Sequence, residues 1–93
     1  MSVSIAIPTA LRPYTDDRAT VRVEAATAGE ALEALTTAHP SLARHLRGAD
    51  GRLRSFVNVY LNDEDIRHLQ KEQTPLKDGD TLIIVPSVAG GAR

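Results

Sequence analysis

The sequence contains no cysteine, which excludes disulfide bonds, zinc sites built on thiolates and a cysteine nucleophile. Aromatic side chains are scarce, since Tyr14, Phe56 and Tyr60 are the only ones in 93 residues. This scarcity argues against stacking on nucleic-acid bases and against a large aromatic ligand pocket. No apolar run is long enough for a membrane-spanning helix.

Neither sign of charge dominates, because 11 Lys and Arg stand against 12 Asp and Glu. A nucleic-acid binder needs a clustered excess of cations, so this balance argues against a nucleic-acid partner. The first residues, MSVSIAIPTALR, lack the basic start and the uninterrupted apolar stretch of a signal peptide. We therefore expect a cytoplasmic protein with no membrane partner.

The length of 93 residues, with 42% apolar and 25% charged residues, fits one globular domain with a single modest core. No repeat, low-complexity block or linker divides the chain. We expect a folded domain over residues 1–86 and a flexible tail over residues 87–93.

Alternating apolar and polar residues indicate half-buried strands. The pattern predicts a first hairpin with its turn at residues 13–17, and strands at residues 3–7, 20–25, 56–61 and 81–85, with a brief edge strand at residues 75–76.

One helix is predicted after the hairpin. Thr27-Ala28-Gly29-Glu30 has the spacing of a capping box, in which the threonine hydroxyl and the glutamate carboxylate satisfy free backbone amides. Apolar residues then recur at helical spacing up to Ala38, and Pro40 stops the helix. We expect Ser41 to cap one further short turn that carries Leu42 and Leu46.

This order of elements predicts an α+β fold, a mixed sheet with one main helix on one face. If the first and last strands lie side by side in the middle, the arrangement is the β-grasp, or ubiquitin-like, fold. The element order comes from the sequence, whereas the strand order is supplied by analogy.

No catalytic constellation is found. The acidic runs at residues 63–65 and 78–80 are predicted to be solvated turns, with Gly79 supplying a positive φ. The histidines at positions 39, 45 and 68 lack the spacing of metal ligands, and no nucleophile elbow or phosphate-binding loop is present. We expect no metal, no cofactor and no enzymatic activity.

Two surface features leave alternatives open. A basic segment is either a solvated loop or a docking surface for an acidic partner; it comprises Arg44, His45, Arg47, Arg52 and Arg54. Strand alternation also turns apolar side chains away from the helix. They are Phe56, Tyr60, Ile83 and Val85, and we add Pro8 from the neighbouring strand and Val88 from the segment after the last strand. These residues form either a partner-binding patch or a face whose residues cover one another.

The chain closes on Val88-Ala89-Gly90-Gly91-Ala92-Arg93, which has little side-chain bulk. Such a segment is either a frayed end or a tail slender enough to enter a narrow channel of another protein. The position of Gly90 and Gly91 shortly after the last strand of a predicted β-grasp domain favours the second interpretation.

The sequence resembles the ubiquitin-like sulfur carriers of the ThiS/MoaD family, most closely the CysO-type carriers of actinobacterial cysteine biosynthesis. The matching stretches span nearly the whole chain in order. They are Ser4-Ile5-Ala6-Ile7-Pro8-Thr9, Leu11-Arg12-Pro13, Phe56-Val57-Asn58-Val59-Tyr60, Asn62-Asp63-Glu64-Asp65, Asp78-Gly79-Asp80 and Val85-Pro86-Ser87-Val88-Ala89-Gly90-Gly91.

The resemblance implies a sulfur carrier rather than an enzyme. An E1-like enzyme would adenylate the carboxylate of Gly91, with Gly90 as its slender neighbour, and sulfur would then convert it to a thiocarboxylate. The implied partners are that E1-like sulfurtransferase, a PLP-dependent cysteine synthase and a JAMM-type metalloprotease. Thiamin or molybdopterin synthesis, protein modification and a plain interaction module remain alternatives.

The sequence departs from a finished carrier in one respect, because Ala92 and Arg93 follow Gly91. The carboxylate of Gly91 is therefore held in a peptide bond, and we expect a proform that is cut between Gly91 and Ala92.

Overall fold

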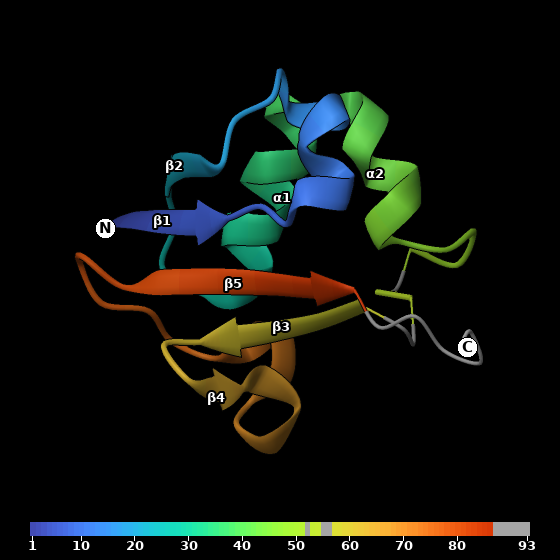
Figure 1. Ribbon diagram of the computed structural model, residues 1–93. Helices are drawn as coiled ribbons and strands as arrows, with labels where there is room; N and C mark the ends of the chain where they lie inside the picture. Colours follow the sequence, from blue (N-terminus) through green and yellow to red (C-terminus); the bar gives the residue numbers. More distant parts are fainter. Residues whose placement is uncertain (52, 55–56, 87–93) are drawn as a thin grey trace.

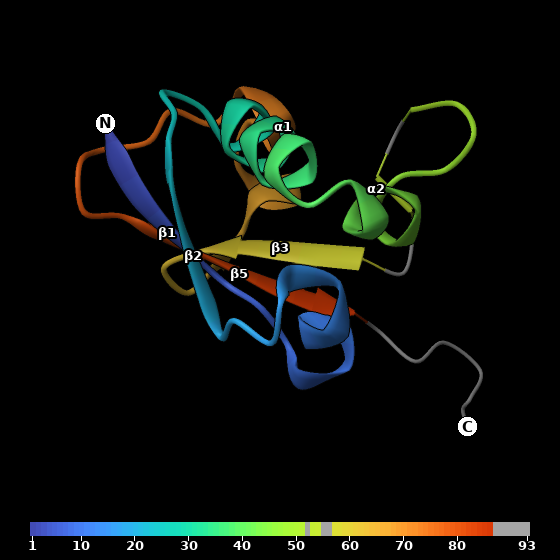
Figure 2. The same ribbon diagram turned by 90° about the horizontal axis from the view of Figure 1, so that it is seen from above.

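The computed structural model describes residues 1–51, 53–54 and 57–86. A mixed sheet forms one layer of the fold, and the helices α1 (Ala28–Ala38) and α2 (Pro40–Leu46) form the other. Both helices lie on the same side of the sheet, which leaves the other side uncovered by either of them (Figures 1 and 2).

Five strands build the sheet in the order β2-β1-β5-β3-β4. Their bounds are β1 (Ser2–Ala6), β2 (Thr20–Glu24), β3 (Val57–Leu61), β4 (Glu64–Asp65) and β5 (Thr81–Pro86). β1 and β5 are parallel neighbours in the middle, and the other pairs are antiparallel. The predicted α+β, β-grasp arrangement is therefore confirmed.

The start of α1 follows the predicted capping box. The Thr27 hydroxyl accepts a hydrogen bond of 3.2 Å from the backbone amide of Glu30. The Glu30 carboxylate accepts one of 3.0 Å from the amide of Ala26, one residue before the cap. The hydroxyl thus satisfies one free amide of the first helical turn, whereas the carboxylate reaches one residue beyond the predicted cap amide and fixes the chain entering the helix. The inner face of α1 buries Leu32 and Leu35 completely.

The second helix is longer than the single turn expected after Ser41. α2 begins at Pro40, and His39 occupies the cap position between the two helices. The prediction erred because proline was considered only as a helix breaker, whereas its fixed φ also suits the first position of a new helix. Leu42 and Leu46 are fully buried, as their spacing predicted.

The connections differ in two places from the predicted turns and edge strand. A 3-10 helix, η1 (Thr9–Thr15), occupies most of the expected first turn. The edge strand beside β3 is β4, because Asn62, with φ of 54°, turns the chain back at once. Pro75 instead makes an isolated bridge to Thr27, so the predicted edge strand at residues 75–76 is wrong.

The core lies between the sheet and the helices. The inward side chains of the three central strands are buried as the alternation predicted; they are Val3, Ile5, Val57, Val59, Leu82 and Ile84. Leu61 is half-buried and packs against them. Two short 3-10 helices follow β4, η2 (Ile66–His68), which contacts β3, and η3 (Lys71–Gln73), which contacts α1; η2 supplies the buried Ile66.

Candidate functional site

β5 carries the C-terminal segment of the sequence, and it is held on both sides. Its residues pair with β1 through Thr81, Leu82 and Ile83, and with β3 along its length up to the pair of Pro86 with Val57. Gly91 follows Pro86 by five residues. The predicted site positions Val88, Gly90, Gly91 and Ala92 lie outside the described residues.

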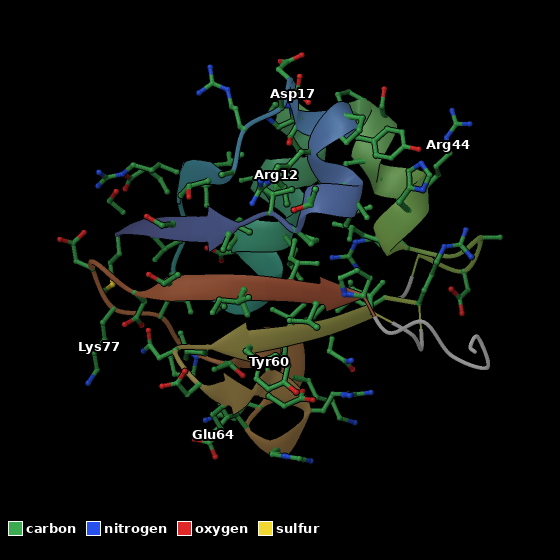
Figure 3. All side chains as sticks on the ribbon, viewed as in Figure 1. Arg12, Asp17, Arg44, Tyr60, Glu64 and Lys77 are labelled. Atoms are coloured by element: carbon green, nitrogen blue, oxygen red, sulfur yellow. The ribbon has the colours of Figure 1, made fainter. Side chains whose placement is uncertain are left out.

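The uncovered face of the sheet has an apolar centre. Ile83 on β5 stands between its strand partners Ala6 and Tyr60, and all three are half-buried. Val85, two residues further along β5, is 40% exposed. In Figure 3 the Tyr60 side chain lies on this face, turned away from the helices. Strand alternation thus places large apolar groups where no helix covers them.

The structure brings together three of the predicted patch residues. Tyr60, Ile83 and Val85 line a shallow hollow of about 320 Å³ that Asp63 completes. Pro8 is half-buried just beyond the end of β1 and does not line this hollow. Phe56 lies outside the described residues. We name Tyr60, Ile83 and Val85 the sheet-face patch.

A fixed cation lies beside the sheet-face patch, and the sequence analysis missed it. The Arg67 guanidinium donates to Asp65 Oδ2 at 2.9 Å and also to Asn58 Oδ1. Asn58 is the strand partner of Val85, so Arg67 reaches the border of the patch. Its side chain remains half-exposed and accessible to a partner.

Asp65 corrects the expectation that all three acidic residues after β3 are solvated. Asp63 and Glu64 are exposed, but Asp65 is buried. Hydrogen bonds from the Arg67 side chain are the main cause that lowers the pKa of Asp65, with further contributions from the Arg67 amide and positive charge. The two residues are separated by one position, a spacing that gave no helical or strand signal of pairing.

The other titratable side chains that the structure describes form no cluster typical of a reaction centre. Among residues 1–51, 53–54 and 57–86, no three histidine, aspartate or glutamate side chains are grouped so that they could hold a metal ion. His45 instead stacks on Tyr14, with ring centroids 4.0 Å apart. In the described part of the chain, no helix is long and apolar enough to cross a membrane.

Comparison with known proteins gives consistent matches. The chain matches the ThiS family over residues 5–91. The sulfur carrier protein CysO of Mycobacterium tuberculosis (strain ATCC 25618 / H37Rv) is 38% identical over 93 residues, which cover 98% of this chain and 100% of that protein.

Solved structures agree with that match. A crystal structure of the Amycolatopsis orientalis BexX/CysO complex contains a chain with a TM-score of 0.86 and 39% identity, covering 96% of this chain and 99% of that one. SAMP1 from Haloferax volcanii has a TM-score of 0.85 and 34% identity, covering 98% and 100%.

A β-grasp body whose central strand leads into a diglycine segment defines the class of ubiquitin-like carrier proteins. Within that class, the chain belongs to the ThiS family. It is a sulfur carrier protein of the ThiS/CysO type, and its relatives are carriers rather than catalysts.

Proposed function

We propose that this protein carries sulfur as a thiocarboxylate on Gly91 and delivers it to cysteine biosynthesis. In this proposal, a partner binds the body formed by residues 1–86, and its active site receives the tail formed by residues 87–93. The name of the CysO relatives and the full-length similarity to them support this proposal.

The observation that carries the proposal is the position of the diglycine. Gly91 follows the central strand by five residues, and the match to the ThiS family extends to residue 91. Five residues of extended chain reach about 17 Å, so a carrier docked by its body can present Gly91 deep inside another protein. Without side chains at positions 90 and 91, the chain passes through a channel too narrow for other residues.

The chemistry requires three steps. Hydrolysis of the Gly91–Ala92 peptide bond consumes one water and releases the Ala-Arg dipeptide and a free carboxylate; a JAMM-type metalloprotease fits this step. An E1-like enzyme then joins the carboxylate to the α-phosphate of ATP and releases pyrophosphate. A sulfur nucleophile at the oxidation level of hydrosulfide then attacks the acyl carbon. AMP leaves with the electrons of the C–O bond, and a thiocarboxylate remains on Gly91.

The acceptor in this proposal is an activated serine derivative on a PLP-dependent cysteine synthase. The thiocarboxylate sulfur forms a C–S bond to the serine-derived carbon as the activating group leaves, which gives a thioester. The acyl group then moves from sulfur to the neighbouring amine, and hydrolysis of the new amide bond by one water releases cysteine and returns the Gly91 carboxylate. Thiamin-thiazole or molybdopterin synthesis would use the same thiocarboxylate with another acceptor. The sheet-face patch, with Pro8 at its margin, serves these partners as a docking surface in each case.

The first test compares two forms of the carrier, the 93-residue chain and the form that ends at Gly91. Each is incubated with ATP and the E1-like enzyme of the same cells, and pyrophosphate release is measured. We expect release only with the shorter form, because only that form has a free Gly91 carboxylate. Equal release from both forms would contradict the proposed processing.

The intact mass of the protein from its own cells provides the second test. We expect the loss of Ala92 and Arg93 and the replacement of one terminal oxygen by sulfur. A full-length mass under sulfur limitation would instead point to a dormant proform or to a plain interaction module.

Protein modification is a second candidate, favoured by the structural similarity to SAMP1. A relative from Haloferax volcanii named small archaeal modifier protein 1 is 43% identical over 75 residues. An activated Gly91 could acylate lysine amines instead of accepting sulfur. Gly91 found in isopeptide linkage to lysines of other proteins in a cell extract would favour this function.

A further inference from the structure

A second hollow lies at the point where the chain leaves β5, on the side of α2. Its volume is about 310 Å³. Side chains from η1, α2, the loop after α2, β3 and β5 converge on it, and the lining residues are Leu11, Arg44, His45, Arg54, Val57 and Pro86. We name it the tail-root cavity, because Pro86 is the last residue of the strand that bears the tail.

The lining of the tail-root cavity is apolar at its base and basic at its rim. Leu11, Val57 and Pro86 supply the apolar part, and none of the described residues that line the cavity is acidic. Arg44 on the rim is exposed, and no carboxylate among the described residues forms an ion pair with it. The cavity therefore suits an apolar group that has negative charge next to it.

Several contacts hold this rim in place. The His45 ring stacks on Tyr14 at an interplanar angle of 26°. Arg54 Nε donates a hydrogen bond of 2.9 Å to the carbonyl oxygen of Arg44, which ties the loop to α2. A binding surface fixed in advance loses less conformational freedom when a partner arrives, so the arrangement favours binding.

Arg52 lies outside the described residues, and the rest of the basic segment is divided into two parts with different surroundings. Arg47 donates to Glu72 Oε1 at 2.8 Å and to the carbonyl oxygen of Gly51 at 2.9 Å, so its charge is used within the fold. Its pKa is raised chiefly by the hydrogen bond to Glu72. Arg44 and His45 instead line the tail-root cavity, and the exposed Arg44 side chain extends outward from α2 (Figure 3).

We infer that the tail-root cavity binds an acidic segment of the enzyme that receives the tail, with a carboxylate on the rim and an apolar side chain on the base. This inference rests on the proposed function. The cavity borders the strand that continues into the tail, and Pro86 on its wall directly follows Val85 of the sheet-face patch. The two surfaces therefore flank the chain where it would enter the enzyme.

The nucleotide of the adenylating enzyme is a less suitable source of the negative charge. It must meet the carboxylate of Gly91, and the extended chain places that carboxylate up to about 17 Å beyond Pro86. The groups beside Pro86 in such a complex belong to the mouth of the channel, which is protein surface. The carboxylates of aspartate and glutamate are the anions available there.

The decisive experiment measures the affinity of the E1-like enzyme for the carrier that ends at Gly91. Arg44→Glu reverses a charge at the rim, and we expect it to weaken binding about ten-fold. Arg44→Lys keeps the charge and should stay close to the wild type. Lys77→Glu is the matched control, since it makes the same charge change at an exposed residue near the opposite end of β5 (Figure 3).

Equal affinities of Arg44→Glu and Lys77→Glu would overturn the inference while leaving the proposed function intact. If the wild type itself is not adenylated, the proposed function fails. A separate titration then tests whether the tail-root cavity binds an acidic peptide.

In that titration, acetyl-Asp-Glu-Leu-Asp-Glu-amide is added to the isotope-labelled 93-residue chain, and amide chemical shifts are followed. We expect saturable shifts at Arg44, His45 and Val57 that disappear in Arg44→Glu and with a lysine-substituted peptide. Their absence in the wild type, as for a cavity already filled by the chain's own tail, would overturn the inference.

Discussion

Replacing Val85 with aspartate tests the role of the sheet-face patch most directly. Val85 is 40% exposed. Full burial of a valine side chain stabilises by about 1.5–3 kcal/mol, so burying this exposed fraction under a partner contributes about 0.6–1.2 kcal/mol to the free energy of binding. An aspartate carboxylate left unpaired under a partner adds a desolvation penalty of at least about 2 kcal/mol. Since about 1.4 kcal/mol corresponds to a ten-fold change, the loss of affinity for the E1-like enzyme should exceed ten-fold.

The structure also predicts the result for a milder change. Val85→Ala removes part of the apolar contact without adding a charge, so its loss of affinity should stay below about ten-fold. Thr37→Asp is the control, because it adds the same charge at an exposed position of α1 on the opposite layer.

Titration calorimetry with the carrier that ends at Gly91 measures these affinities, and thermal unfolding verifies the fold. Aspartate suits a strand poorly, at a cost of about 1 kcal/mol, which lowers the midpoint of a domain of this size by about 4–8 °C. Unchanged affinity of a folded Val85→Asp variant would refute the reasoning and remove Val85 from the docking surface.

Two further predictions concern the body of the fold. Thr27→Ala removes the acceptor at the start of α1 and should lower the free energy of unfolding in urea by about 1 kcal/mol, whereas Thr27→Ser should not. Asp65→Asn weakens the pair with Arg67 and should lower the free energy of unfolding modestly at pH 7, because solvent screens the half-exposed Arg67. Because the folded-state pKa of Asp65 is lowered, the pair stabilises the fold above about pH 4 and this stabilisation is lost as the pH falls through the folded value. The difference between wild type and Asp65→Asn should therefore shrink at about pH 2, and an equal difference at both pH values would speak against the pair.

Local sequence patterns predicted most of the elements. The capping box at Thr27 and Glu30 was predictable because its partners are three residues apart, and the strand alternation around Ile83 was visible within six residues. The pairing of β1 with β5 is a different case. It joins Ser4 to Thr81, and no local pattern records a contact over that distance, so only analogy with a known fold supplied it.

The errors also have physical causes. A run of acidic residues carries no sign of which member turns inward, so the sequence predicts solvent exposure for Asp65 as for its neighbours. The answer depends on Arg67 and on Asn58 of the adjacent strand, which meet only after folding. Local sequence likewise could not predict that Arg47 is paired within the fold, because its partner Glu72 lies 25 residues away along the chain.

The central position of β5 has a mechanical consequence. An enzyme that draws the end of this chain into a channel pulls along the axis of a strand hydrogen-bonded to β1 on one side and β3 on the other. Such a load shears both ladders at once instead of opening their bonds one after another, as it would if it peeled an edge strand away. The central position of β5 should therefore let the body resist unfolding under such a pull better than a body with its C-terminal strand at the edge of the sheet.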